Sequence, residues 1–568
     1  MIASPELQSA ECYAEVQGDA FDFDAVCARY DTLGEALEAA SSAAAALDVF
    51  TRWDELRRSL DTSSRLIELR FRQATNDPQH KAANESLNDL RPRLEGLDVA
   101  MKRRFLASPV RAALAEALGE HTLALWAADV TAFDPRVQTL AVRESGLQDE
   151  YTELMAGARF DFHGERLTLP TLGKYAENPD RELRREAAFV KWGFYADQRA
   201  RLDRIFDDVV HVRDRMAREL GFPNFVALGY RRLRRTDYGP DDVARYRETI
   251  VREIVPLARR IVEAQAREIG VGEVMLWDEQ IFGTAPPPKP PAAYDEMLGA
   301  AERTFDVLGA EIGGLARLMA ERELLDLRAR EGKAGGGFCT SFPTYGLPYV
   351  FANFNGTTLD VNVLLHEMGH AFQCYASRGK PISDHLWATT EASEVHSMSM
   401  EFLAWPQLEQ FFGAAAGRYR GQHLKSSILA LPYAAAVDHF QHLVYEHPEA
   451  SPAERHGFWR QLEATYLPWR RHGGIEHLEN GGYWQMQRHI YLSPFYYIDY
   501  ALAMCCALQF WSRSLDDHAG ALSDYVALCK RGGELPFQAL VRSAGLRSPF
   551  DEGVLRDVAQ RAAAVIGV

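Results

Sequence analysis

Residues 362–374 of the chain read NVLLHEMGHAFQC, with two histidines four positions apart and a glutamate directly after the first. On a helix, residues i and i+4 lie one turn apart on the same face, so His366 and His370 can bind one ion together. Imidazole nitrogen is a good zinc ligand. Glu367 lies about a hundred degrees around the helix, where it can reach an ion-bound water without being a ligand. The stretch therefore predicts a helix that carries a metal site and an adjacent base.

The residues around the two histidines support this interpretation. Gly369 lies between them, and an internal glycine costs about 1 kcal/mol of helix stability relative to alanine, so we expect another backbone or a substrate to approach closely there. The neighbouring positions are apolar, namely Leu364, Leu365, Met368, Ala371 and Phe372. Buried neutral histidines without partners are unfavourable in such surroundings, and a metal ion would satisfy them. The alternative is an amphipathic helix whose histidines are satisfied by hydrogen bonds alone.

A catalytic zinc ion takes three protein ligands and keeps one position open. The third histidine of one well-known pattern would fall at position 376, which is Ala376, so the third ligand must lie elsewhere. Helix-ending signals predict that the first helix stops near Arg378-Gly379 and that a second helix begins around residues 383–386.

If these two helices pack antiparallel, residues equally far from the turn lie level with each other. The residue level with His370 is then Glu394. Glu391, Glu394 and Glu401 recur on one face of the second helix, so one can coordinate while the others orient the histidines. His396 is an alternative ligand, although it points away from that face. These positions predict Glu394 as the third ligand of a single ion.

The composition is that of an ordinary globular protein, with 47% hydrophobic and 25% charged residues. The formal net charge is −17, and a surface of that sign repels phosphate backbones, so we expect no nucleic-acid partner. The run RRLRR at 231–235 is the exception, and we interpret it as a solvated helix end or loop.

The seven cysteines are scattered and show no C-x-x-C spacing, which argues against a disulfide framework and for a reducing compartment. The first residues, MIASPELQSAECYAEV, lack the features of a signal peptide, and no apolar run is long enough to span a bilayer. We therefore expect a cytoplasmic protein without a membrane partner.

Hydrophobic periodicity predicts a mainly α-helical chain, with helical spacing through residues 51–75, 82–106, 182–220 and 243–261. Three stretches interrupt this pattern. Residues 159–169 alternate and predict a β-hairpin with its turn at His163-Gly164. The proline-rich residues 284–293 predict a surface loop between two helices. YVFANF at 349–354 predicts a strand in a small mixed sheet beside the metal-binding helix.

The length of 568 residues exceeds what one compact core usually takes. We expect an N-terminal helical region over residues 1–200, which includes the hairpin. A catalytic domain over residues 201–568 would then carry the metal site.

Four stretches give the chain a resemblance to a known family. They are HEMGHAFQ at 366–373, SEVHSMSME at 393–401, PYVFANFNGT at 348–357 and RHIYLSPFYYIDYALA at 488–503. Through these stretches the chain resembles the M3 family of zinc oligopeptidases, and most of all its bacterial Pz-peptidase and oligoendopeptidase branch. The resemblance implies a zincin-type metallopeptidase fold, a helical ellipsoid with a deep central channel that admits short unfolded peptides.

The resemblance also implies roles for the residues of the motif. It implies that His366, His370 and Glu394 bind a single Zn²⁺, and that Glu367 is the general base that activates the attacking water.

A histidine and paired tyrosines near the C-terminal end are further implied to close over the substrate. The candidates here are His489, Tyr497 and Tyr500, with Tyr491 and Tyr496 as alternatives. Phenolic hydroxyls can donate hydrogen bonds to an oxyanion, although aromatic clusters often serve packing alone.

Together these features predict a zinc-dependent oligoendopeptidase that hydrolyses internal bonds of short unfolded peptides, as a monomer or a small homo-oligomer. The strand at 349–354 is expected to pair with the substrate backbone through its edge. Residues 335–337, three glycines, are expected to let the peptide lie close.

Alternatives remain at this point. The spacing of 28 residues from His366 to Glu394 is also typical of angiotensin-converting enzyme, so a zinc carboxypeptidase or peptidyl-dipeptidase is one alternative. A non-catalytic peptide-binding protein is another, against which the intact Glu367 argues. The pair His439 and His442 is a weaker candidate for a second metal site, and packed histidines are its preferred interpretation.

Overall fold

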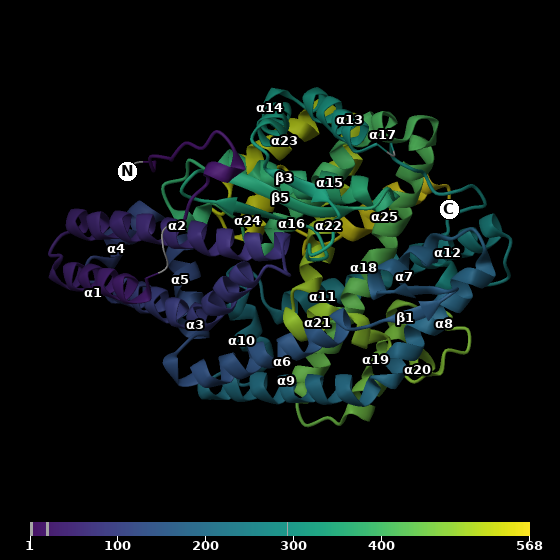
Figure 1. Cartoon of the computed structure of the whole chain (residues 1–568), viewed down its shortest axis with the longest axis horizontal. Coiled ribbons are helices and arrows are strands. Elements are labelled where there is room, and N and C mark those ends of the chain that lie inside the picture. The colour runs from purple at the N-terminus through teal and green to yellow at the C-terminus, as the bar shows by residue number, and fades with distance from the viewer. Residues whose placement is uncertain (1–3, 19–21, 292) are drawn as a thin grey trace.

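The computed structural model describes residues 4–18, 22–291 and 293–568. Figure 1 shows a mainly α-helical molecule whose described strands form two small sheets. This confirms the expected fold class at that level. None of the helices within these ranges combines the length and the apolarity needed to cross a lipid bilayer.

The N-terminal part of the described chain consists mainly of helices. They are α1 (Phe23–Ala39), α2 (Ala43–Gln73), α3 (Pro78–Ala107), α4 (Arg111–Leu118), α5 (Glu120–Ala132), α6 (Gln138–Ala156), α7 (Leu169–Gly173), α8 (Arg181–Asp197), α9 (Arg199–Glu219) and α10 (Phe225–Arg232). The helical spacing predicted over 182–220 corresponds to α8 and α9, which are separate helices.

Helices α1 to α5 form an N-terminal lobe at one side of the molecule (Figure 1). The centre of this lobe is aromatic, because the rings of Phe50, Trp53, Phe105 and Trp126 lie 5.3–6.1 Å apart between centroids. Aromatic side chains bury much apolar area each, so a few of them suffice to hold these helices together. The Ser42 hydroxyl accepts a hydrogen bond from the first turn of α2 and caps that helix.

The alternating stretch forms the predicted hairpin, in which β1 (Phe160–Phe162) pairs antiparallel with β2 (Glu165–Leu167). His163 and Gly164 make its turn with φ values of 49° and 82°. Positive φ at both positions is what a two-residue hairpin turn needs.

The amphipathic stretch after Gly239 forms α11 (Pro240–Thr249) and α12 (Val255–Ile269), with a π-helical turn between them. The proline-rich stretch follows, and its described residues contain neither helix nor strand before α13 (Tyr294–Val307) begins. The prediction of a loop between two helices is confirmed for those residues.

The arginine run at 231–235 begins in the last turn of α10, so the expected helix end is confirmed and Arg231 is exposed, but the run is not solvated throughout. Arg235 is 4% exposed, and its guanidinium donates to Asp499 at 2.6 Å. Arg234 donates to Asp129 at 2.6 Å. Acidic residues from distant parts of the chain neutralise both guanidinium groups, and that neutralisation permits the burial of Arg235.

The C-terminal half adds a three-stranded sheet and the helices around it. Its strands are β3 (Leu325–Arg328), β4 (Phe338–Phe342) and β5 (Leu347–Phe354). Its helices are α14 (Ala310–Glu321), α15 (Thr358–Ser377), α16 (Thr390–Leu403), α17 (Glu409–Phe412), α18 (Ala416–Glu446), α19 (Pro452–Tyr466), α20 (Glu476–Glu479), α21 (Arg488–Leu492), α22 (Tyr497–Asp516), α23 (His518–Arg531), α24 (Phe537–Ser543) and α25 (Val554–Ile566).

The sheet has the order β3-β5-β4, with β3 parallel and β4 antiparallel to β5. The predicted strand at 349–354 is therefore real and lies in a mixed sheet. Because β5 has a neighbour on each side, its backbone groups are already paired, and the expectation that this strand offers an edge to a substrate is wrong. Among the described strands of this sheet, β4 and β3 are the edges.

Helix α15 carries the histidine motif and ends at Ser377, close to the predicted end. The second helix does not begin at 383–386 as predicted. Residues Ser383–His385 form a 3-10 turn, and α16 begins only at Thr390. Helix α16 then runs between α15 and α22 and is buried along almost its whole length.

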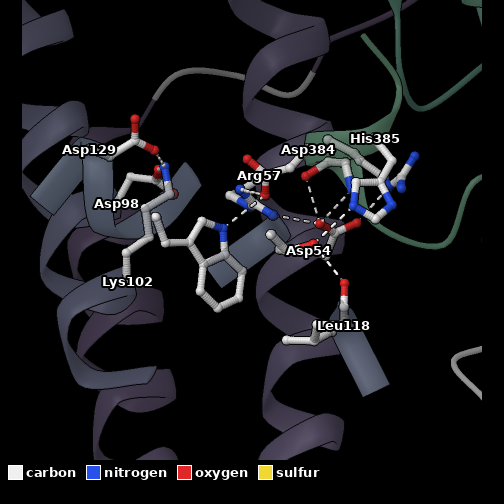
Figure 2. Close-up of polar contacts among 12 residues, drawn as sticks. Asp54, Arg57, Asp98, Lys102, Leu118, Asp129, Asp384 and His385 are labelled. Atoms are coloured by element: carbon white, nitrogen blue, oxygen red, sulfur yellow. Dashed lines mark hydrogen bonds and ion pairs between the residues drawn. The ribbon is translucent and has the colours of Figure 1, made fainter. Parts of the chain in front are cut away.

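Figure 2 shows the polar contacts that this turn makes. Asp384 accepts hydrogen bonds from Arg57 at 2.9 Å and from the Trp126 indole at 3.1 Å. The His385 ring bonds the Thr122 hydroxyl at 2.9 Å. These partners belong to α2 and α5, so the turn between the two motif helices is fastened to the N-terminal lobe.

Candidate metal centre

The side chains of His366, His370 and Glu394 meet between α15 and α16. Their donor atoms all lie within 4.8 Å of one another. The Glu394 Oε2 atom is 3.3 Å from His366 Nε2 and 3.6 Å from His370 Nε2. The structure thus brings together the three residues that the sequence selects, and no other group of this kind occurs within the described ranges.

The spacing of these three donors fits a zinc ion. Ligands about 2.0–2.1 Å from a tetrahedral zinc ion lie roughly 3.3 Å from one another, which matches the two measured separations. Two imidazole nitrogens and one carboxylate oxygen are also the donor types that a catalytic zinc site uses. Glu394 is 4% exposed, whereas the two histidine side chains are 22% and 13% exposed, so the group remains open on one side.

The helices approach closely because of Gly369. A Cβ atom at this position would lie 2.7 Å from both the His396 carbonyl oxygen and the Ser397 Cα. Further along, the Gln373 amide donates to the Leu386 carbonyl at 2.9 Å. Gly369 thus faces residues 396 and 397, whereas Gln373, later on α15, faces the earlier residue Leu386. The two segments therefore run antiparallel, as predicted. Of the two expectations for the glycine, the approach of another backbone is confirmed.

The charges of the group depend on one another. Burial disfavours an ionised Glu394, but hydrogen bonds from both histidines hold its pKa well below the usual value. Burial likewise disfavours a charged His366, but its bonds to Glu394 and Glu401 raise its pKa well above the usual value. A buried carboxylate that gathers positive partners in this way is suited to a divalent cation.

Glu367 follows His366 on α15 and takes no part in the donor group. Its side chain is buried, and Oε2 has no hydrogen-bond partner among the described residues. Burial raises the pKa of this carboxyl above its usual value, which brings it closer to the range suited to a general base. A Cβ atom at Gly337, just before β4, would lie 3.8 Å from Glu367 Oε1.

The other two glutamates of the acidic face have different surroundings. Glu401 Oε1 lies 2.8 Å from His366 Nδ1, which is the orienting contact that the sequence analysis expects of a neighbouring acid. Glu391 does not join the group. Burial and the nearby Asp499 raise the pKa of Glu391 to about 8. The alternative ligand His396 is fully buried and is not part of the donor group, and neither of its ring nitrogens has a described hydrogen-bond partner.

The aromatic segment at 488–500 lies against the donor group. The His489 ring centroid is 5.1 Å from that of Tyr497 and 5.9 Å from that of Tyr500. The hydroxyl that reaches the donor group belongs to Tyr496, which donates to Glu394 Oε1 at 2.5 Å. Tyr496 had been only an alternative in the sequence, because it precedes α22 and helical spacing cannot tell where it points.

Tyr491 is a packing residue in this structure. It is fully buried, and its ring stacks on that of Tyr151 at 4.0 Å between centroids. The pair His439 and His442 does not converge either. His439 bonds the Tyr466 hydroxyl at 3.1 Å, and His442 takes a partner of its own, the hydroxyl of Tyr230 at 3.2 Å.

His489 is held in one tautomer by its neighbour. The Tyr433 hydroxyl donates to Gln487 Oε1 at 2.9 Å, and the Gln487 amide nitrogen lies 2.6 Å from His489 Nδ1. The amide therefore donates to Nδ1, which leaves the ring proton on Nε2. Burial and the neighbouring Arg488 lower the pKa of His489 to about 4, so the ring is neutral and can donate through Nε2.

Comparison with known proteins gives matches over nearly the whole chain. A family model described as peptidase family M3 matches residues 174–285 and 301–560, more than half of the sequence. A model described as the peptidase M3 N-terminal domain matches residues 13–133. A search of curated proteins finds no match.

Several solved structures share the fold at substantial identity. One named for oligoendopeptidase F is 42% identical with a TM-score of 0.94, covering 98% of this chain and 99% of that one. One named PZ peptidase A with an inhibitor is 38% identical with the same TM-score and coverage. One named for an oligoendopeptidase F from Bacillus anthracis is 37% identical with a TM-score of 0.90, and the match covers 99% of each chain.

Proposed function

The chain belongs to peptidase family M3 and is a metallopeptidase, and on this premise we propose that it is a zinc-dependent oligoendopeptidase acting on short unfolded peptides. The observation that carries the proposal is the convergence of two imidazole nitrogens and one carboxylate oxygen beside the buried carboxylate of Glu367, whose Oε2 has no described hydrogen-bond partner. A structural metal site would have no use for such a base.

In this proposal His366, His370 and Glu394 hold a single zinc ion. When bound, the ion supplies Lewis acidity, which polarises the peptide carbonyl and acidifies a water molecule. Glu367 takes a proton from the attacking water and passes it to the leaving amine. Its buried position beside the donor group supports this role, because a base must lie within hydrogen-bond reach of the proton it moves.

Donors to the developing oxyanion come from the aromatic segment. We propose His489, Tyr497 and Tyr500 for this role, together with Tyr496. The neutral His489 offers Nε2–H, and the tyrosines offer hydroxyl groups around it. Such donors stabilise the charge that appears only in the transition state.

The substrate backbone is proposed to pair with β4 instead of β5. Strand β4 has β5 as its only described strand neighbour, so its other edge can add an extended peptide. The chain enters β4 past Gly337, beside Glu367, while Gly335 and Gly336 face open space. A peptide can therefore lie close to the base along this edge.

Two cavities favour internal cleavage, one beside Trp387 and one at the start of α15. One of about 570 Å³ lies between the N-terminal lobe and the start of α16, and its lining includes Trp387, whose ring centroid is 6.3 Å from that of His370. The other, of about 460 Å³, is lined by Thr358 and Asn362 at the opposite end of α15. Room on both sides suits a peptide that continues past the cut bond in both directions, within the channel that the family resemblance implies.

The broader expectations remain proposals. They are a catalytic domain over 201–568 after a helical region over 1–200, a cytoplasmic location, and a monomer or small homo-oligomer. The helical region supplies one wall of the larger cavity, so we expect it to take part in substrate binding.

The function is tested by measuring the zinc content of the purified protein together with its cleavage of an internally quenched peptide that has a blocked C-terminus. We expect zinc in a one-to-one ratio with the chain, internal cleavage, loss of activity with a chelator and recovery with added zinc. A strict carboxypeptidase would leave the blocked peptide intact. A protein without zinc or hydrolysis would be a peptide-binding protein instead.

The role of Glu367 has a separate test. In Glu367→Gln the side-chain volume is kept but the base is lost, so kcat/KM should fall by about 10²–10⁴-fold. Zinc content should stay at the parent level, because Glu367 is not one of the three donors. Hydrolysis at the parental rate would mean that another group is the base.

A further inference from the structure

A chain of hydrogen bonds extends outward from His366, away from the donor group. His366 Nδ1 lies 2.8 Å from Glu401 Oε1, and Glu401 Oε2 lies 2.8 Å from His423 Nε2. The Trp405 indole nitrogen then lies 3.0 Å from His423 Nδ1. Glu401, His423 and Trp405 are each less than 9% exposed, so these contacts are largely shielded from solvent.

The Trp405 indole determines which ring nitrogens carry the protons in this chain of hydrogen bonds. An indole N–H can only donate, so Nδ1 of His423 must accept, and the His423 proton is on Nε2. His423 therefore donates to one oxygen of Glu401. An ionised carboxylate only accepts, so His366 must donate through Nδ1 to the other oxygen. A neutral His366, which is the form that binds zinc, then has its lone pair on Nε2, the atom that faces Glu394.

We propose that His423 and Trp405 are positioning residues, which act through Glu401 to hold His366 in the tautomer and orientation that bind zinc. The proposal rests on the proposed zinc site. Glu401 is the acceptor that the two rings share.

The surroundings of His423 suit a residue that is held in one place. Its ring centroid is 4.6 Å from that of Phe402 and 5.8 Å from that of Tyr419. The other proposed histidine ligand has no equivalent support, because His370 Nδ1 is buried without a hydrogen-bond partner among the described residues. The orienting contacts therefore act on one of the two imidazoles.

Zinc affinity tests the proposal, measured by competition with a chromophoric chelator on the whole protein. His423→Leu removes the donor to Glu401 and should weaken zinc binding by about 10–100-fold, the usual effect of losing an outer-sphere partner. His423→Gln should bind nearly as tightly as the parent, because an amide can donate to Glu401 and accept from Trp405. Trp405→Phe keeps an aromatic ring but loses the donor, and should weaken binding by about tenfold.

His442→Leu is the matched control, since His442 is a buried histidine on the same helix whose described partners lie outside this chain of bonds. It should leave zinc affinity unchanged. The proposal is overturned if His423→Leu and Trp405→Phe bind zinc as tightly as the parent. It is also overturned if His423→Gln or the control loses as much as His423→Leu.

The role of His423 and Trp405 can be tested even if His423→Leu fails to fold. If His423→Leu does not fold, the comparison of Trp405→Phe with His423→Gln decides, with the same expected difference. If the parent itself binds no zinc, the proposed function fails, and this inference fails with it. A parent that binds zinc beside unaffected variants refutes only the inference.

Discussion

Tyr496 is the residue through which the aromatic segment contacts the donor group. Its hydroxyl donates to Glu394 Oε1, while its ring lies 5.8 Å from that of His489 and 5.1 Å from that of Tyr500. Burial and the adjacent Glu394 raise the pKa of Tyr496, so it remains a donor at any physiological pH. A hydroxyl in this position can orient the proposed ligand and also reach a developing oxyanion.

Replacement of Tyr496 by phenylalanine tests this position. We expect Tyr496→Phe to lower kcat/KM by about 100-fold, the size of effect seen when one oxyanion donor is removed, in an assay with the quenched peptide. Tyr491→Phe is the control, because Tyr491 is packed against Tyr151 and should keep full activity. If Tyr497→Phe loses activity and Tyr496→Phe does not, Tyr497 is the oxyanion donor, as the sequence predicts.

At the scale of the elements, the centre depends on two helices that touch through a glycine. Gly369 places the backbone of α15 directly against that of α16. The glycine weakens α15 by about 1 kcal/mol relative to alanine. In return the helices come close enough for a short glutamate side chain on α16 to reach both imidazoles on α15. Helix α16 is buried on all sides, so it has little freedom to move away.

Gly369→Ala should therefore be destabilising although alanine is the better helix former. The added Cβ would lie 2.7 Å from backbone atoms of α16, which cannot rotate away. Overpacking of this kind costs about 1–3 kcal/mol, more than the gain in helix propensity, and zinc affinity should fall with it. The shift of the urea unfolding midpoint is the measurement.

Gly193→Ala is the matched control for this substitution. Gly193 lies inside α8 with nothing within 4 Å of its added Cβ, so alanine there should raise stability by about 0.4–1 kcal/mol. Equal stabilisation by both substitutions would show that the two helices are not in close contact at Gly369.

At the scale of the whole molecule, the centre is fastened to the N-terminal lobe by buried ion pairs (Figure 2). Asp384 accepts from Arg57 of α2, and Arg57 also donates to Asp54 at 2.7 Å. Lys102 of α3 donates to Asp129 of α5 at 2.8 Å. The turn that leads into α16 thus shares one network of charges with the lobe that lines the larger cavity.

Asp384→Asn should destabilise the protein by about 3 kcal/mol, because it leaves buried guanidinium groups short of a partner. Burial opposes ionisation of Asp384, but Arg57, Lys102 and Arg234 hold its pKa well below the usual 3.8. The carboxylate therefore contributes stability that is fully present above about pH 4 and is lost as the pH falls below that value. The parent's unfolding midpoint should drop in acid more steeply than that of the variant.

Asp557→Asn is the control for the loss of a single carboxylate. Asp557 pairs with Arg547 on the surface, where each side chain is about half exposed, so its loss should change stability by less than about 1 kcal/mol. Equal effects of the two substitutions would mean that the buried network does not hold the lobe.

Much of the local structure was predictable because it depends on spacing within short stretches. The hairpin at 159–169, the helix around the histidines and the convergence of Glu394 on them all follow from periodicity and turn residues. Predictions failed where segments far apart in the sequence determine the surroundings of a residue. The arginine run at 231–235 looks solvated in sequence, and its acidic partners Asp129 and Asp499 come from far along the chain.

By itself the sequence determined the mainly helical class, the helix that presents two imidazoles beside a carboxylate, and the acidic face on which Glu394 lies. Only the tertiary structure decided that β5 lies inside its sheet, that α16 begins at Thr390, and that Tyr496 contacts Glu394. The reason is physical. Periodicity encodes which face of one element is apolar, whereas strand order, the ends of a tethered helix and the direction of a side chain depend on neighbours that the chain brings together only when it folds.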